Sequence, residues 1–317
     1  MSLELPRADD LRILRSLCHY VFDLPEHTVS VELVRLWLSE RARRATRRAW
    51  KKSRIYHYTS AARELGLLCK KDWHHFCLTS DGERMAECRG LGRSIAGRLT
   101  RDEKELFATI LPKYPAVREY MALFMPDRLP AATVSDFLAR GRPIRVVTLG
   151  RKRYQMLLAD GTSLQIDRVR KMSYAWTLYR WFHTLGILDD LYIERPASFL
   201  DDSKHEVRAF FPIRHTHITT GVFRKWVVEQ FSSESDAISR VYIPEVLEKI
   251  CTTYGVPKKR CLSCIVDLHE SDPIRFPLEM MSSLRADPRC LNHHGYENFP
   301  EVQGIRRSHL WINVTRG

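Results

Sequence analysis

The chain has 317 residues, 44% hydrophobic and 28% charged, a composition typical of a folded protein with room for two or three domains. Its 51 basic and 38 acidic residues give a formal net charge of +13, which favours a polyanionic partner because phosphate binding releases counterions. Neither a run of about 20 apolar residues nor a secretory signal is found, so the sequence predicts a cytoplasmic protein with reduced cysteines and no membrane partner.

Apolar residues at helical spacing predict two helices near the start of the chain. The first is expected between residues 8 and 24, with Leu11, Leu14 and Val21 on one face. The second is expected to begin at Ser30 and to carry Leu38 on its apolar face.

Residues 41–54 hold the densest positive charge in the chain, eight cations without an acidic residue. A third helix, with Thr46 as its N-cap, is expected to carry part of this charge and to end near Gly66. Such a helix can place cations beside the phosphates of a DNA major groove. The residues predicted to bind DNA here are Arg43, Arg44, Arg47, Arg48, Lys51, Lys52, Arg54 and Tyr56.

Residues 48–68 are similar to residues 168–188. Both segments begin with cations, continue with aromatic residues and end in a Leu-Gly-apolar-Leu sequence, at Gly66 and Gly186. A second basic helix, capped by Asp167, is therefore expected to end at Gly186. The residues predicted to bind DNA in or before this helix are Arg151, Lys152, Arg153, Arg168, Arg170, Lys171 and Tyr174.

Residues 67–69 and 76–78 are expected to form a short hairpin, followed by a turn at Thr79–Gly82. The expected order in residues 8–88 is two helices, a basic helix and a hairpin, and the hairpin ends in Leu78-Thr79-Ser80-Asp81-Gly82. Residues 8–88 therefore resemble winged-helix DNA-binding proteins. The resemblance implies a compact helical domain with a hairpin wing that binds DNA.

The rest of the chain shows further signals of helices and strands. Thr100 and Glu103 have the spacing of a capping box, and strands are expected at 144–149 and 154–158. A helix at 244–253, a turn at Gly255 and a basic helix that begins at Pro257 have the order of a helix-turn-helix. A strand is expected at 309–314. The residues predicted to bind DNA in this part are Lys258, Lys259 and Arg260.

The sequence contains candidates for two other kinds of site. Cys261-x-x-Cys264 and Cys290-x-x-His293 have zinc-ligand spacing, but small buried side chains on a helix explain the first pair equally well, and no metal is expected. A metal-dependent nuclease would need converging carboxylates, and the acidic residues concentrated near 189–206 are the candidates. These are Asp189, Asp190, Glu194, Asp201, Asp202 and Glu206.

The sequence therefore predicts a mainly α protein with short β-hairpins, an α+β fold built from tandem winged-helix or helix-turn-helix units. The expected domains are residues 1–92, 93–197 and 198–317. The expected function is non-catalytic binding of double-stranded DNA without a cofactor. The alternatives are a metal-dependent nuclease and a scaffold subunit that binds other proteins of a larger complex.

Overall fold

A computed structural model describes residues 8–46, 52–88, 97–150, 153–166, 169–192, 206–231, 238–280 and 298–313, although not the side chains of residues 42–46, 52–53, 150, 169–174 and 206. The fold of the described residues is mixed α/β, which confirms the expected mixture of helices and short strands. The chain forms two compact units, whose boundaries do not decide the predicted three-domain division. Unit 1 consists of Met1–Ala122, Leu129–Phe137 and Arg170–Gly186, and unit 2 of Leu123–Arg128, Leu138–Val169 and Ile187–Gly317.

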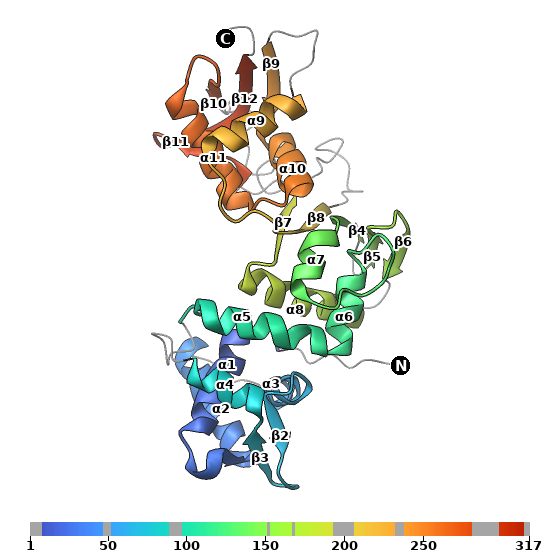
Figure 1. The fold of residues 1–317 in the computed structure, drawn as a ribbon, viewed down its shortest axis with the longest axis vertical. Coiled ribbons are helices and arrows are strands. Elements are labelled where there is room, and N and C mark those ends of the chain that lie inside the picture. Colours follow the sequence, from blue (N-terminus) through green and yellow to red (C-terminus); the bar gives the residue numbers. More distant parts are fainter. Residues whose placement is uncertain are drawn as a thin grey trace. The chain divides into compact units, whose positions relative to one another are not determined.

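The elements are labelled in Figure 1. The helices are α1 (Leu11–Phe22), η1 (Pro25–His27), α2 (Val31–Thr46), α3 (Lys52–Glu64), α4 (Ser80–Glu87), α5 (Arg101–Ile110), η2 (Leu111–Lys113), α6 (Pro115–Ala122), α7 (Val134–Arg140), α8 (Val169–Leu185), α9 (Thr220–Phe231), α10 (Ile243–Tyr254) and α11 (Lys258–Ser271). The strands are β1 (Thr28–Ser30), β2 (Leu68–Lys70), β3 (His75–Leu78), β4 (Ile144–Gly150), β5 (Arg153–Leu157), β6 (Ser163–Ile166), β7 (Leu188–Tyr192), β8 (Glu206–Pro212), β9 (Ile238–Tyr242), β10 (Leu278–Met280), β11 (Glu301–Val302) and β12 (Ile305–Asn313).

One arrangement of strands occurs three times along the chain. In each case one strand comes before a segment that contains a helix, and the last strand lies in antiparallel pairing between this strand and the first strand after the segment. The third case also includes the short β11, which pairs with the start of β12. The strand orders are β1-β3-β2, β4-β8-β7 and β9-β12-β10. The intervening segment is α2–α3 in the first repeat, the β5–β6 hairpin and α8 in the second, and α10–α11 in the third.

The first two repeats share the glycine turn that the sequence similarity predicts. Gly66 and Gly186 have left-handed backbones, with φ of +68° and +76°, and a strand begins two residues after each. Glycine adopts this conformation without the steric cost that a Cβ brings. The apolar residues beside the glycines are buried in both repeats, namely Leu65, Leu67 and Leu68 in the first and Leu185, Ile187 and Leu188 in the second.

Thr79 and Gly82 attach α4 to the turn after α3. The Thr79 hydroxyl donates a hydrogen bond to the Gly66 carbonyl and accepts one from the Gly82 N–H (3.1 Å). The Thr79 N–H donates to the Leu67 carbonyl at 3.2 Å. The prediction of a turn at Thr79–Gly82 is wrong, because Thr79 is the N-cap of α4 and Gly82 lies in its first turn.

Gly82→Ala is expected to lower the free energy of unfolding by about 3 kcal/mol, because a Cβ there would lie 2.1 Å from the Leu67 carbonyl oxygen and force the main chain to move. Gly66→Ala is the control. Its Cβ would have no neighbour within 4 Å, so it pays only for the left-handed backbone, about 1 kcal/mol. Urea denaturation of both variants checks this, and equal losses would contradict it.

Unit 1 contains a buried ion pair between α1 and α5. Arg15 Nη1 lies 3.3 Å from Glu103 Oε2, and both side chains are 1% exposed. Glu103 Oε2 also accepts a hydrogen bond from the Thr100 N–H (2.7 Å), and Thr100 Oγ1 accepts one from the Glu103 N–H (3.3 Å). The predicted capping box is therefore confirmed, and its carboxylate also links two helices.

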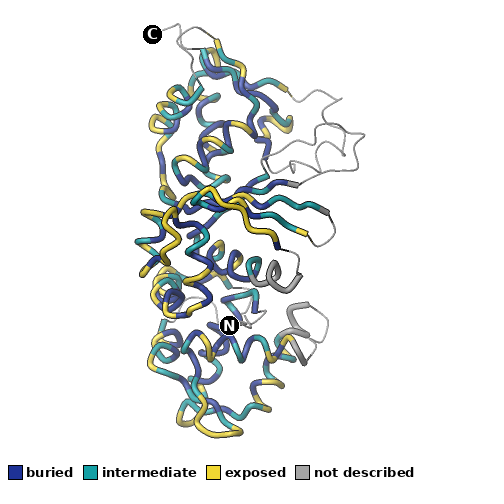
Figure 2. Tube along the Cα trace, turned by 90° about the vertical axis from the view of Figure 1, so that its right-hand side faces the viewer, coloured by how far each residue is buried: buried dark blue, intermediate teal, exposed yellow. Residues whose placement is uncertain are grey.

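In unit 2, α10 and α11 are joined by a short turn at Gly255, as the sequence predicts. Gly255 has a φ of +67°, and a Cβ there would lie 2.6 Å from the Pro212 carbonyl oxygen. Pro257 is the N-cap of α11 rather than its first residue. Buried residues of both helices form much of the core of this unit, coloured dark blue in Figure 2, including Ile250, Cys251, Cys261, Cys264 and Ile265.

Three further details differ from the predictions. Thr46 is the last residue of α2 rather than the N-cap of α3, because the helix continues into the basic segment. Strand β1 was not predicted, since three residues are too few to show an alternating pattern. The strands of the expected hairpins belong to larger sheets, which have three, four and five strands within the described part of the chain.

No helix in the described part of the chain has the length and apolar character needed to cross a bilayer.

Candidate nucleic-acid interface

The structure places the predicted DNA-binding residues on several elements, and describes the side chains of six of them. These six are Arg54, Tyr56, Arg153, Lys258, Lys259 and Arg260. The backbones of Arg43 and Arg44 belong to α2, that of Lys52 to α3, and those of Arg170, Lys171 and Tyr174 to α8. Six predicted DNA-binding residues fall outside the described residues, namely Arg47, Arg48, Lys51, Arg151, Lys152 and Arg168. The predicted cap Asp167 also falls outside them.

Helix α3 has one buried and one exposed face. Ile55, Tyr58 and Ala62 are buried, whereas Arg54 and Arg63 are exposed and Tyr56 keeps 64% of its surface. The alternation follows the helical period, because residues three or four apart lie on the same side. The aromatic residues of the sequence repeat therefore have two roles, since Tyr58 packs in the core and Tyr56 faces solvent.

Residues Ala8 and Asp9 connect the two similar helices α3 and α8 within unit 1. The Asp9 carboxylate accepts a hydrogen bond from Tyr58 Oη (2.9 Å) and pairs with Arg54 (3.3 Å) and Arg180 (2.5 Å). The buried indole of Trp181 donates from Nε1 to the Ala8 carbonyl at 2.6 Å. Burial and the nearby Asp9 charge raise the pKa of Tyr58, so it remains a donor. Both helices are thus anchored at their inner faces by one short segment.

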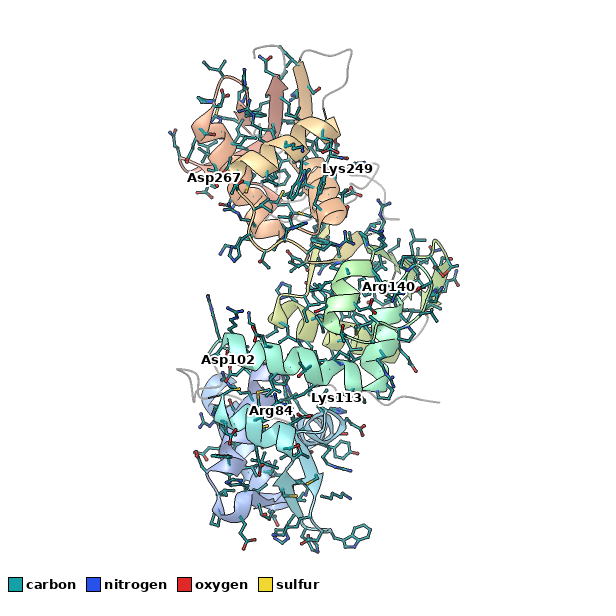
Figure 3. The ribbon with its side chains drawn as sticks, viewed as in Figure 1. Arg84, Asp102, Lys113, Arg140, Lys249 and Asp267 are labelled. Atoms are coloured by element: carbon teal, nitrogen blue, oxygen red, sulfur yellow. The ribbon has the colours of Figure 1, made fainter. Side chains whose placement is uncertain are left out.

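Several exposed cations outside residues 41–54 already have carboxylate partners. Figure 3 labels three of them: Arg84 and Lys113 both pair with Asp81 in unit 1, and Arg140 pairs with Asp127 in unit 2. Such exposed pairs contribute little to stability but reduce the local positive charge. Residues 41–54 include no acidic residue, so the excess positive charge of the sequence is most concentrated there.

In the third repeat only part of the predicted cationic cluster faces solvent. Lys259 is exposed at the start of α11. Arg260 instead donates from Nε and Nη2 to the Ile218 carbonyl, at 3.2 and 2.5 Å, and lies 3.8 Å from Asp267. Arg260 therefore helps to fix the segment that leads into α9, and Lys259 is better placed than Arg260 for a phosphate.

The acidic residues of the nuclease alternative have structural partners where the structure describes them. Asp189 Oδ2 accepts a hydrogen bond from the Lys258 N–H at 2.8 Å, which places a negative charge at the N-terminus of α11. Asp190 pairs with Arg208 at 3.0 Å. Glu194, Asp201 and Asp202 fall outside the described residues, and for Glu206 only the backbone, in β8, is described.

Asp189→Ala is expected to lower the free energy of unfolding by about 1 kcal/mol, the usual cost of losing a helix cap, while DNA affinity stays unchanged. Asp189→Asn should retain most of the stability, because its amide oxygen can accept the same hydrogen bond. Thermal unfolding and DNA titration of the two variants measure both effects. A stable Asp189→Ala protein would contradict the capping role.

Cysteines and histidines form two groups. Cys261 and Cys264 are buried on the inner face of α11, and burial raises the pKa of Cys264 to about 11, whereas zinc binds thiolates. Cys290 and His293 fall outside the described residues. In the first hairpin, Cys69 is directly opposite Cys77, so the two share a face. Among the described residues no three His, Cys, Asp or Glu side chains converge as metal ligands.

Two surface features were missed by the sequence reasoning. Trp73, in the β2–β3 connection, is strongly exposed; a tryptophan in a polar turn was the available signal. A hollow of about 540 Å³ in unit 2 is lined by Arg224, Lys225, Arg275, the acidic Glu229 and the ring of Phe276, among others. Arg224 lies over the Phe276 ring, 5.3 Å from its centroid. These residues are far apart in sequence, so only the fold brings them together.

A scan against models of known protein families found no match to this chain, and searches of curated proteins and of solved structures found none either.

Proposed function

We propose that the protein binds double-stranded DNA, without catalysing a reaction, through tandem winged-helix units. The observation that carries the proposal is the first repeat. Its elements follow the order α1–β1–α2–α3–β2–β3, with β3 in the centre of the sheet. The eight cations of residues 41–54, a segment without an acidic residue, span the junction of α2 and α3. In a winged helix, the helix after this junction enters the major groove and the hairpin is the wing.

The third repeat supports the same reading. Its order is α9–β9–α10–α11–β10–β11–β12, which matches that of the first repeat except for the short β11, paired with the start of β12. Strand β12 is again the central strand. A winged-helix unit accounts for the first and the third repeat, because each repeat then supplies one helix for the DNA groove and one hairpin for the DNA backbone. The second repeat keeps the strand order and the glycine turn, with a hairpin where the others have a helix.

The roles of the cations follow from their chemistry. Most hydrogen bonds between a protein and DNA go to phosphates. These contacts position the protein but do not distinguish one base sequence from another. The proposed phosphate ligands are therefore the exposed Lys259 and the cations of residues 43–52 and 168–171. Arg54 is included because it is exposed, although it also pairs with Asp9. Tyr56 is proposed to donate from its hydroxyl to a phosphate or sugar oxygen. Of the carboxylates of the nuclease alternative, Asp189 and Asp190 already hold α11 and Arg208.

The experiment is an electrophoretic competition in which a labelled random duplex, bound to the full chain, is challenged with unlabelled duplex, single strand or RNA of equal length. The proposal predicts that duplex DNA competes best and that added Mg²⁺ or Mn²⁺ produces no cleavage. Binding limited to RNA or single strand, or metal-dependent cleavage of the duplex, would overturn it.

A further inference from the structure

Trp73 is the most exposed of the large hydrophobic side chains that the structure describes, with 87% of its surface accessible. It lies in the connection between β2 and β3, at the tip of the hairpin of the first repeat, where residues 70–74 are all exposed. An aromatic ring of this size normally gains free energy by leaving water. A fully presented ring at a hairpin tip is therefore suited to contact a ligand.

The tip is held in one conformation by hydrogen bonds around Asp72. Asp72 Oδ1 accepts hydrogen bonds from the N–H groups of His74 (2.7 Å) and His75 (2.8 Å), and its Oδ2 lies 2.9 Å from His75 Nδ1. Lys71 Nζ pairs with Glu26 of η1 at 3.0 Å, and the Val31 N–H donates to the His74 carbonyl at 2.8 Å. The backbone that carries Trp73 is thus ordered before any ligand binds, which lowers the entropic cost of binding.

Lys70 is the cation that contacts the ring, whereas Lys71 pairs with Glu26 and the Asp72 carboxylate accepts hydrogen bonds within the tip. Lys70 Nζ lies 5.4 Å from the centroid of the Trp73 ring, and Lys71 and His74 are exposed beside it. A ligand for this tip should therefore combine a flat aromatic group with negative charge. A nucleotide within a nucleic acid has both, and stacking of a base on an aromatic side chain suits any of the four bases.

We infer that Trp73 stacks on a base that has left the duplex stack, so that the protein prefers DNA containing unpaired bases over fully paired DNA. Bases inside a continuous duplex are covered on both faces and offer only their edges to the grooves. A ring on a hairpin can stack only where a face is free, as at a gap, a bulge or an opened pair. This inference rests on the proposed function, since the basic helices supply the binding to the paired flanks.

The test compares two duplexes of the same length and with the same ends, one fully paired and one with three unpaired bases at its centre. Wild-type protein should bind the second about tenfold more tightly, within the range expected for one stacked base. Trp73→Ala should remove this preference while leaving the affinity for paired duplex unchanged, and Trp73→Phe should retain part of it. The control is Leu129→Ala, which removes another exposed apolar side chain of unit 1 and should change neither affinity.

A fluorescence measurement gives a second readout. The loss of tryptophan emission when the unpaired DNA binds should be smaller in Trp73→Phe than in wild type. Equal affinities of wild type for the two duplexes, or a preference that persists in Trp73→Ala, would overturn the inference and leave the proposed function intact. Absence of binding to the paired duplex would instead contradict the proposed function. If Trp73 instead contacts a protein partner or a lipid surface, wild type should bind the two duplexes with equal affinity.

Discussion

Replacing Arg47, Arg48, Lys51 and Lys52 together by alanine is expected to lower the affinity for random duplex DNA on the order of 100-fold at about 0.2 M salt. Each lost phosphate contact also removes about one unit from the slope of log affinity against log salt concentration. The effect should be large because the four cations belong to a segment without acidic residues, so no carboxylate of that segment compensates them. Fluorescence anisotropy with a labelled duplex measures both quantities.

A matched control removes the same amount of charge from other helices of unit 1. Its four substitutions are Arg101→Ala, Lys104→Ala, Lys113→Ala and Arg118→Ala, on α5, η2 and α6. Arg101 and Lys113 already pair with Glu105 and Asp81. The control should change the affinity far less than the first variant does. Equal losses in the two variants would mean that net charge alone drives binding, and no loss in either would place the interface elsewhere.

The largest loss of stability is expected from Arg15→Leu, about 3–5 kcal/mol of unfolding free energy. The substitution leaves the Glu103 carboxylate buried between α1 and α5 without its cationic partner. The double variant Arg15→Leu/Glu103→Leu should recover part of this loss, because it removes the buried charge even though it also removes half of the capping box. Guanidinium denaturation of wild type, Arg15→Leu and the double variant measures the three free energies of unfolding. A double variant less stable than Arg15→Leu would contradict the prediction.

Much of the local structure follows from short sequence signals. The glycines at 66, 186 and 255 end helices, Thr100 and Glu103 start one, and the stripe with Leu11 and Leu14 marks a buried face. These features are predictable because each depends on residues that are close in sequence. The similarity between residues 48–68 and 168–188 also predicts a repeated backbone, since both segments have the same glycine turn and buried flanks.

Features that depend on distant residues could not be predicted. The central positions of β3, β8 and β12 arise from pairing with strands that precede the helices, and β1 is too short to be recognised. The shared role of Asp9 toward Arg54, Tyr58 and Arg180 joins residues up to 171 positions apart. The structural use of Arg260 likewise depends on the Ile218 carbonyl, which no local pattern places beside it.

The most direct test of the central claim, that the basic helices meet duplex phosphates, is the salt dependence of wild-type binding. Affinity for a fully paired random duplex is measured by anisotropy at several salt concentrations between about 50 and 200 mM. The proposed interface predicts a straight line of log affinity against log salt concentration with a slope of about −4 or steeper. An affinity that hardly changes over this range would contradict the claim.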